Sequence, residues 1–202
     1  TGKKTSGTFG EMFKSFSSSA LVVGAIAGIG AVVSSIGNKV VEVTAKYQKF
    51  EAVLTNTLGS KSEAQKAMKQ ILDFAAKTPF QVDELTDSFV KFANRGIKLT
   101  IAEMTKLGDI ASSQGKSFNQ LTEAVLDAQT GEFERLKEFG IRASKEGDKV
   151  TLSFKGVTKE VANNEQAIKN AIVSYGELSG VAGGMEAISK TLGGSLSNMA
   201  DS

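Results

Sequence analysis

The sequence predicts a mainly α-helical protein. Its centre is a compact helical bundle with one small β-hairpin, flanked by a long N-terminal apolar helix with a heptad pattern and by a Gly-rich C-terminal helix. Three observations predict this fold. The 202 residues include a single Pro, which permits long helices. Three capping-box patterns and two glycine stops fall within about 80 residues. Eight of the twelve Phe residues lie between Phe74 and Phe154, which places the aromatic core there.

Residues 1–15 are predicted to be a polar, mobile lead-in, and residues 16–58 to form one long helix. Apolar residues recur along this helix at strict four-three spacing, which is the heptad pattern of a seam that packs on another helix. Gly24 and Gly28 form a small-xxx-small pair that would let a partner backbone approach closely. The helix-packing seam consists of Val22, Ile26, Ile29, Val33, Ile36, Val40, Val43, Tyr47, Phe50 and Leu54.

The partner of this seam is left open by the pattern alone. A second copy of the chain, the chain's own core or its Gly-rich C-terminal helix could cover it. A bilayer is a further alternative, because Ala20 to Val33 is wholly apolar or Gly. That run is shorter than the roughly 20 residues that span a membrane. A membrane span would also not need to keep register with a charged helix, so packing of the seam on another helix or on the chain's own core is favoured over a membrane span.

Residues 59–178 are predicted to form the bundle. Gly59 ends the long helix, and capping boxes at Ser60–Glu63, Thr100–Glu103 and Ser117–Gln120 each open a helix. Gly96 and Gly140 are expected to stop helices in the left-handed conformation. Helices are expected over about 60–77, 82–95, 100–115, 117–130, 132–139 and 163–175. Their predicted core faces include Ala64, Ala67, Met68, Ile71, Leu72, Ala75, Leu85, Phe89, Phe92, Ala93, Phe118, Leu121, Val125, Ala128, Ala167, Ile168, Ala171, Ile172 and Tyr175.

The segment 149–161 alternates apolar and polar residues at period two, around a Lys155-Gly156 turn, and predicts the β-hairpin. An isolated hairpin is marginal, so its apolar face should be covered by the bundle. The C-terminal segment, 179–202, is predicted to be a Gly-rich helix. Gly180, Gly183 and Gly184 are expected to act as a hinge at its start.

The sequence points to no catalytic chemistry. It has no His and no Cys, which excludes His general bases, thiolate nucleophiles and Cys-based zinc sites. Glycine patterns at 28–30 and 115–117 lack the spacing of nucleotide-binding motifs. Carboxylates cluster at Glu132, Glu134 and Glu138 and again at 83–87, but basic neighbours or a helix N-terminus account for them. We predict no enzyme activity, cofactor or metal. The net charge of +2 predicts no sequence-specific nucleic-acid binding.

Several runs of residues, in this order, carry a family resemblance. They are Thr78-Pro79-Phe80-Gln81-Val82-Asp83-Glu84-Leu85, Phe92-Ala93-Asn94-Arg95-Gly96-Ile97, Leu107-Gly108-Asp109-Ile110-Ala111, Thr130-Gly131-Glu132-Phe133-Glu134-Arg135-Leu136-Lys137-Glu138-Phe139-Gly140-Ile141 and Lys149-Val150-Thr151-Leu152-Ser153-Phe154-Lys155-Gly156. Together they resemble the N-terminal domain of tail tape measure proteins of tailed bacteriophages and prophages. The resemblance covers about Tyr47 to Ser202.

The resemblance implies a non-enzymatic structural protein. Such a protein is assembled in the bacterial cytoplasm, lies in the tail tube lumen, sets tail length, and leaves on infection to help DNA cross the host envelope. Its implied partners are copies of itself, the tail tube, tail assembly and tip proteins, and the host membrane. A membrane-active or pore-forming helical protein is the alternative function. Because Thr1 is not a start residue and 202 helical residues reach only about 300 Å, we expect an excerpt of a longer chain.

Overall fold

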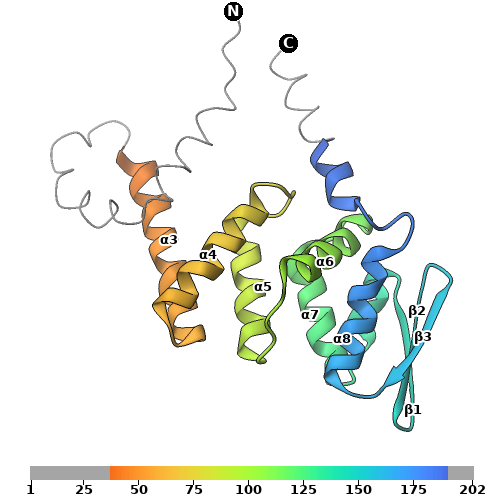
Figure 1. The fold of residues 1–202 in the computed structure, drawn as a ribbon. Coiled ribbons are helices and arrows are strands. Elements are labelled where there is room, and N and C mark those ends of the chain that lie inside the picture. The colour runs from red at the N-terminus through yellow and green to blue at the C-terminus, as the bar shows by residue number, and fades with distance from the viewer. Residues whose placement is uncertain (1–36, 191–202) are drawn as a thin grey trace, which may run out of the picture. The chain divides into compact units, whose positions relative to one another are not determined.

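A computed structural model of the protein describes residues 37–190 (Figure 1). The chain divides after Tyr47 into two units, and the packing described below is that of the second, which begins at Gln48. The helices are α3 (Gly37–Leu58), α4 (Lys61–Ala75), α5 (Val82–Asn94), α6 (Ile101–Ser113), α7 (Phe118–Gln129) and α8 (Glu165–Ser174), with 3-10 helices η1 (Glu134–Phe139) and η2 (Tyr175–Glu177). The strands are β1 (Arg142–Glu146), β2 (Lys149–Phe154) and β3 (Val157–Ala162). Residues 184–190 form a further helix. The predicted mainly helical class is confirmed for the described residues.

Two of the three predicted capping boxes form in full. The Thr100 hydroxyl accepts a hydrogen bond from the Glu103 amide at 3.2 Å, and the Glu103 carboxylate accepts one from the Thr100 amide at 2.9 Å. Ser117 and Gln120 make the same reciprocal pair. At the start of α4 only half of the box is present: Ser60 accepts from the Glu63 amide, while the Glu63 carboxylate binds Lys66 instead.

Both glycine stops form as predicted. Gly96 has a φ of +72°, and the amide of the next residue, Ile97, donates to the Phe92 carbonyl at 2.9 Å. The amide of Ile141 likewise donates to the Leu136 carbonyl, one residue after Gly140. This hydrogen bond closes a Schellman motif, which needs a residue with positive φ. One expectation is corrected here, because the helix predicted over 132–139 is the 3-10 helix η1.

The predicted hairpin is part of a three-stranded antiparallel sheet with the order β1-β2-β3. Strands β2 and β3 match the prediction. Their turn places Lys155 at φ +46° and Gly156 at φ +80°, the two positive values that suit a two-residue hairpin. Strand β1 was not predicted. It pairs along the other edge of β2, from Arg142 opposite Ser153 to Glu146 opposite Lys149.

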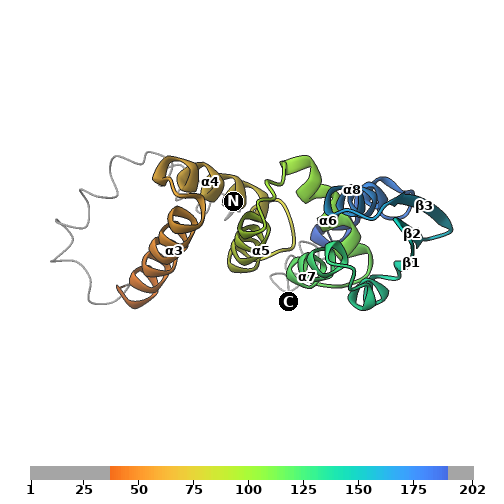
Figure 2. The same ribbon diagram turned by 90° about the horizontal axis from the view of Figure 1, so that it is seen from below.

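The core of the second unit lies between its helices and one face of the sheet (Figures 1 and 2). Phe118, at the start of α7, makes edge-to-face contacts with Phe74 of α4 at 6.3 Å and with Phe80 of the α4–α5 connection at 5.4 Å. Most predicted core residues are buried. The exceptions are only partly buried: Leu72, Ala75, Phe89, Ala93 and Ala167.

Helix α8 and η2 cover the sheet. The apolar face predicted for the hairpin, Val150, Leu152 and Phe154, is at most 2% exposed. Phe154 contacts the Tyr175 ring edge-on at 5.5 Å, and the Tyr175 hydroxyl donates to the Leu152 carbonyl at 2.8 Å. Because this hydroxyl is surrounded by apolar groups, burial raises the pKa of Tyr175 to about 12. The sheet is therefore tied to the helices by both packing and a buried hydrogen bond.

Candidate functional site

The predicted helix-packing seam lies only partly within the described residues. Its first half, Val22, Ile26, Ile29, Val33 and Ile36, falls outside them, as do Gly24 and Gly28. Val40 and Val43 lie on α3, so the predicted helix extends through both positions. Further along α3, Tyr47 and Phe50 are half-buried and Leu54 is completely buried. The intermolecular role of the seam stays a prediction.

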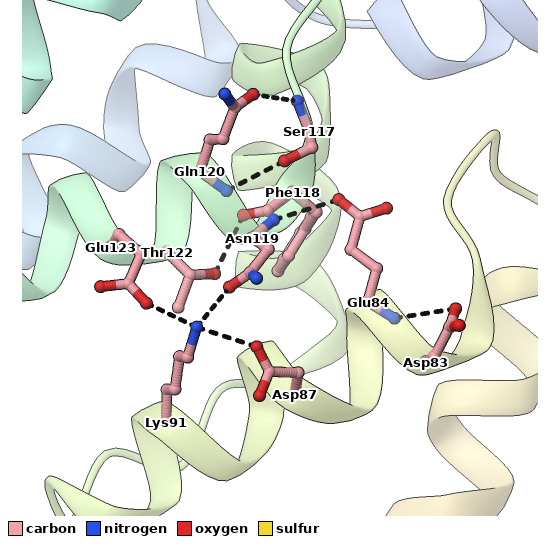
Figure 3. A network of polar contacts seen from close by, with 10 residues as sticks. All are labelled: Asp83, Glu84, Asp87, Lys91, Ser117, Phe118, Asn119, Gln120, Thr122 and Glu123. Carbon is pink, nitrogen blue, oxygen red and sulfur yellow. Dashed lines mark hydrogen bonds and ion pairs between the residues drawn. The ribbon is translucent and has the colours of Figure 1, made fainter. Parts of the chain in front are cut away.

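A polar network joins α5 to α7 (Figure 3). The Lys91 ammonium contacts the carboxylates of Asp87 at 2.8 Å and Glu123 at 2.5 Å, and it donates to the side-chain oxygen of Asn119 at 2.8 Å. All three ammonium protons therefore have an acceptor. Partial burial acts to lower the pKa of Lys91, but the hydrogen bonds and charges of Asp87 and Glu123 outweigh it and raise that pKa above its usual value.

Glu84 belongs to the same network. Its carboxylate accepts a hydrogen bond from the Asn119 amide at 3.1 Å, in the first turn of α7 (Figure 3). The sequence interpretation placed the carboxylates at 83–87 on the first turns of their own helix. The structure agrees with that position. In addition, Glu84 contacts α7 directly, and Asp87 contacts Lys91, which in turn contacts Asn119 and Glu123 of α7. This arrangement fixes two helices against each other.

A second ion pair joins α6 to α8 and was missed by the sequence analysis. The Lys169 ammonium contacts Glu103 at 2.6 Å, and its side chain is only 5% exposed. The other oxygen of Glu103 accepts from the amide and hydroxyl of Thr100. Burial acts to raise the pKa of Glu103, but the hydrogen bonds from Lys169 and Thr100 outweigh this effect and hold the pKa below its ordinary value. One carboxylate thus caps α6 and neutralises a buried charge.

Two acidic residues of η1 are paired at the surface. Glu134 contacts Lys137 at 2.8 Å, and Glu138 lies 3.6 Å from Lys116. The pairing of Glu134 follows the sequence expectation, whereas the partner of Glu138 comes from the α6–α7 connection. Within residues 37–190 no group of three or more acidic side chains is placed to hold a metal ion. The same residues include no helix with the length and apolar character of a membrane span.

Comparison with known proteins identifies one family. The family model described as "Tape measure protein" matches residues 38–202, which is more than half of the chain. The match begins one residue after the start of α3 and includes every helix and strand of the second unit. No curated protein and no solved structure matches the chain.

Proposed function

Because the chain belongs to the tape measure protein family, and so is a structural component of a phage tail, we propose that it forms part of the ruler that fixes tail length in the tube lumen. We further propose that it assists DNA passage through the host envelope. The observation that carries this proposal is the family match over residues 38–202. Ion pairs between helices, such as Lys91–Glu123 and Lys169–Glu103, also support a structural role.

The architecture supports different roles for two segments of the chain. Helix α3 spans about 33 Å at 1.5 Å per residue, and its second half, from Gln48, belongs to a folded unit of short helices and a sheet. A straight helix adds length in proportion to its residues, whereas a folded unit adds bulk. We propose that residues 16–58 contribute length and that residues 59–178 form a domain that anchors this end to other tail proteins.

The seam from Val22 to Phe50 is proposed to join copies of the chain inside the tube, whereas Leu54 is already buried within the single chain. Its support is the continuous heptad register in the sequence and the helical backbone from Gly37 onward. Tail tube, assembly and tip proteins are the other proposed partners. The alternative function, membrane activity during infection, is favoured by one observation: the apolar run from Ala20 to Val33, with Gly24 and Gly28 within it.

The proposed location and exit can be tested on purified virions of the parent phage. Quantitative mass spectrometry should find peptides of α4 and α7 in intact virions, and DNA release should deplete them at least tenfold. A tail tube protein, measured in the same samples, serves as the control that stays constant. Absence of these peptides from intact virions would refute the luminal ruler. An unchanged amount after DNA release would refute the role in DNA passage.

A further inference from the structure

One carboxylate of α6 hydrogen-bonds to the start of the helix at residues 184–190. Asp109 lies in α6 and is 6% exposed. One of its oxygens accepts a hydrogen bond from the Gly183 amide and the other from the Met185 amide, both at 3.0 Å. These amides belong to the first turn of the helix, where N–H groups have no partner within the helix itself. The carboxylate therefore caps a helix that lies more than seventy residues away in the sequence.

At Gly184 the two backbones come too close for a residue with a side chain. A methyl group on Gly184 would lie 2.9 Å from the Asp109 carbonyl oxygen, which is too close for a real contact. On the facing helix, a methyl group on Gly108 would lie 2.3 Å from the sulfur of Met185. The contact between α6 and this helix is thus built from one carboxylate, two glycines and one buried Met side chain.

Two features of this contact favour its opening. The hydroxyls of Ser112 on α6 and Ser189 on the helix are buried without a hydrogen-bond partner among the described residues. Burying an unpaired hydroxyl is unfavourable, so these groups weaken the contact. The connection to the helix also contains Gly180 and Gly183, both with positive φ, and glycine loses more conformational freedom on folding than any other residue.

We propose that Asp109 is a latch. When its two hydrogen bonds break, residues 183–190 leave α6 as a unit, while α5, α7, α8 and the sheet stay folded. The hinge expected at Gly180, Gly183 and Gly184 would then act only in the released state. If the proposed function holds, this contact is where the folded domain would begin to open when the protein leaves the tube. The latch itself does not depend on that function.

Amide hydrogen exchange of the full chain tests the latch. Asp109→Asn keeps the shape of the side chain but offers one acceptor oxygen and places an NH2 group against a backbone amide. The Gly183 and Met185 amides should exchange at least tenfold faster, while amides of α7 such as Leu121 and Val125 keep their protection. Asp73→Asn removes an equal charge from an exposed pair with Lys69 and should change neither set.

A second variant tests the same contact through a different atom. Gly184→Ala pushes the helix away from α6 without touching the carboxylate, and it should give the same pattern of exchange. Unchanged exchange at Gly183 and Met185 in both variants would overturn the latch. It would also be overturned if both variants lost protection in α7 to the same extent, because Asp109 would then support the whole core. Neither result depends on tail assembly, so failure of the latch can be separated from failure of the proposed function.

Discussion

Glu103→Gln should destabilise the folded unit by about 3 kcal/mol, the lower end of the range for breaking a buried ion pair. The substitution leaves the Lys169 ammonium, which is 5% exposed, without a counter-charge. Lys169→Met should cost less, about 1 kcal/mol or below. It removes the buried charge, and Glu103, which is 22% exposed, keeps its hydrogen bonds from Thr100. The double variant should be more stable than Glu103→Gln alone. Urea unfolding of the four proteins measures this cycle.

The exposed pair Glu63–Lys66 provides the matched control, because its side chains are 53% and 71% exposed. The same cycle there should give a coupling below about 0.5 kcal/mol. Equal losses of unfolding free energy in Lys169→Met and Glu103→Gln would contradict this role of the α6–α8 pair. So would a double variant that is no more stable than Glu103→Gln.

The Glu103 pair also predicts a direction of pH dependence. The folded state holds the pKa of Glu103 below its ordinary value of 4.5, so this group stabilises the fold above that pH. The contribution is lost as the pH falls from there through the folded-state pKa. Stability curves measured between pH 7 and pH 3 should therefore be flatter for Glu103→Gln than for the parent chain.

Replacing Ile29 and Ile36 with Asp should dissociate the proposed oligomer and leave the folded unit intact. Each buried seam residue contributes on the order of 1.5–3 kcal/mol, so two buried charges in one seam should abolish association. The matched control is Asn38→Asp with Ala45→Asp, which adds the same two charges at outer positions of the heptad pattern. Light scattering reports the mass of each protein, and circular dichroism reports whether the unit from Gln48 onward remains folded.

The seam experiment also separates the alternatives. If the seam packs on the chain's own core, the variant with two Asp residues should melt earlier without any change in mass. If residues 16–38 enter lipid, the parent chain should float with liposomes, and Gly24→Leu with Gly28→Leu should increase flotation. A parent chain that floats, combined with a variant that keeps its mass, would replace the seam interpretation with the membrane one.

Local signals account for the parts of the fold that could be predicted. Thr100, Ser117, Gly96 and Gly140 act within three to five residues of themselves, and each was placed correctly. The Ser60 box formed only in part, because Lys66 lies one turn beyond Glu63 and competes for its carboxylate. Such competition depends on side-chain geometry that sequence spacing does not contain.

Features that depend on distant partners were missed. Strand β1 is rich in charged residues and carries little apolar surface, so no alternation marks it. It forms because β2 offers an open edge, and the Gly147-Asp148 pair between them was the available turn signal. Lys169 resembles a surface residue in sequence, and its partner Glu103 lies 66 residues away. The Asp109 contact was missed for the same reason, because the Asp109 carboxylate and the Gly183 and Met185 amides meet only in the folded chain.

Tail length in the parent phage is the decisive measurement for a length-setting role of residues 16–58. Inserting two further copies of residues 40–53 adds four heptads without breaking the register, and at 1.5 Å per residue the tail should lengthen by about 42 Å. A Gly/Ser insert of the same length at the exposed Gly147-Asp148 turn, in the folded unit, should leave tail length unchanged. Electron microscopy of both phages provides the measurement. If only the phage with the helical insert has longer tails, residues 16–58 contribute to tail length. If both phages have tails of parental length, this role is contradicted.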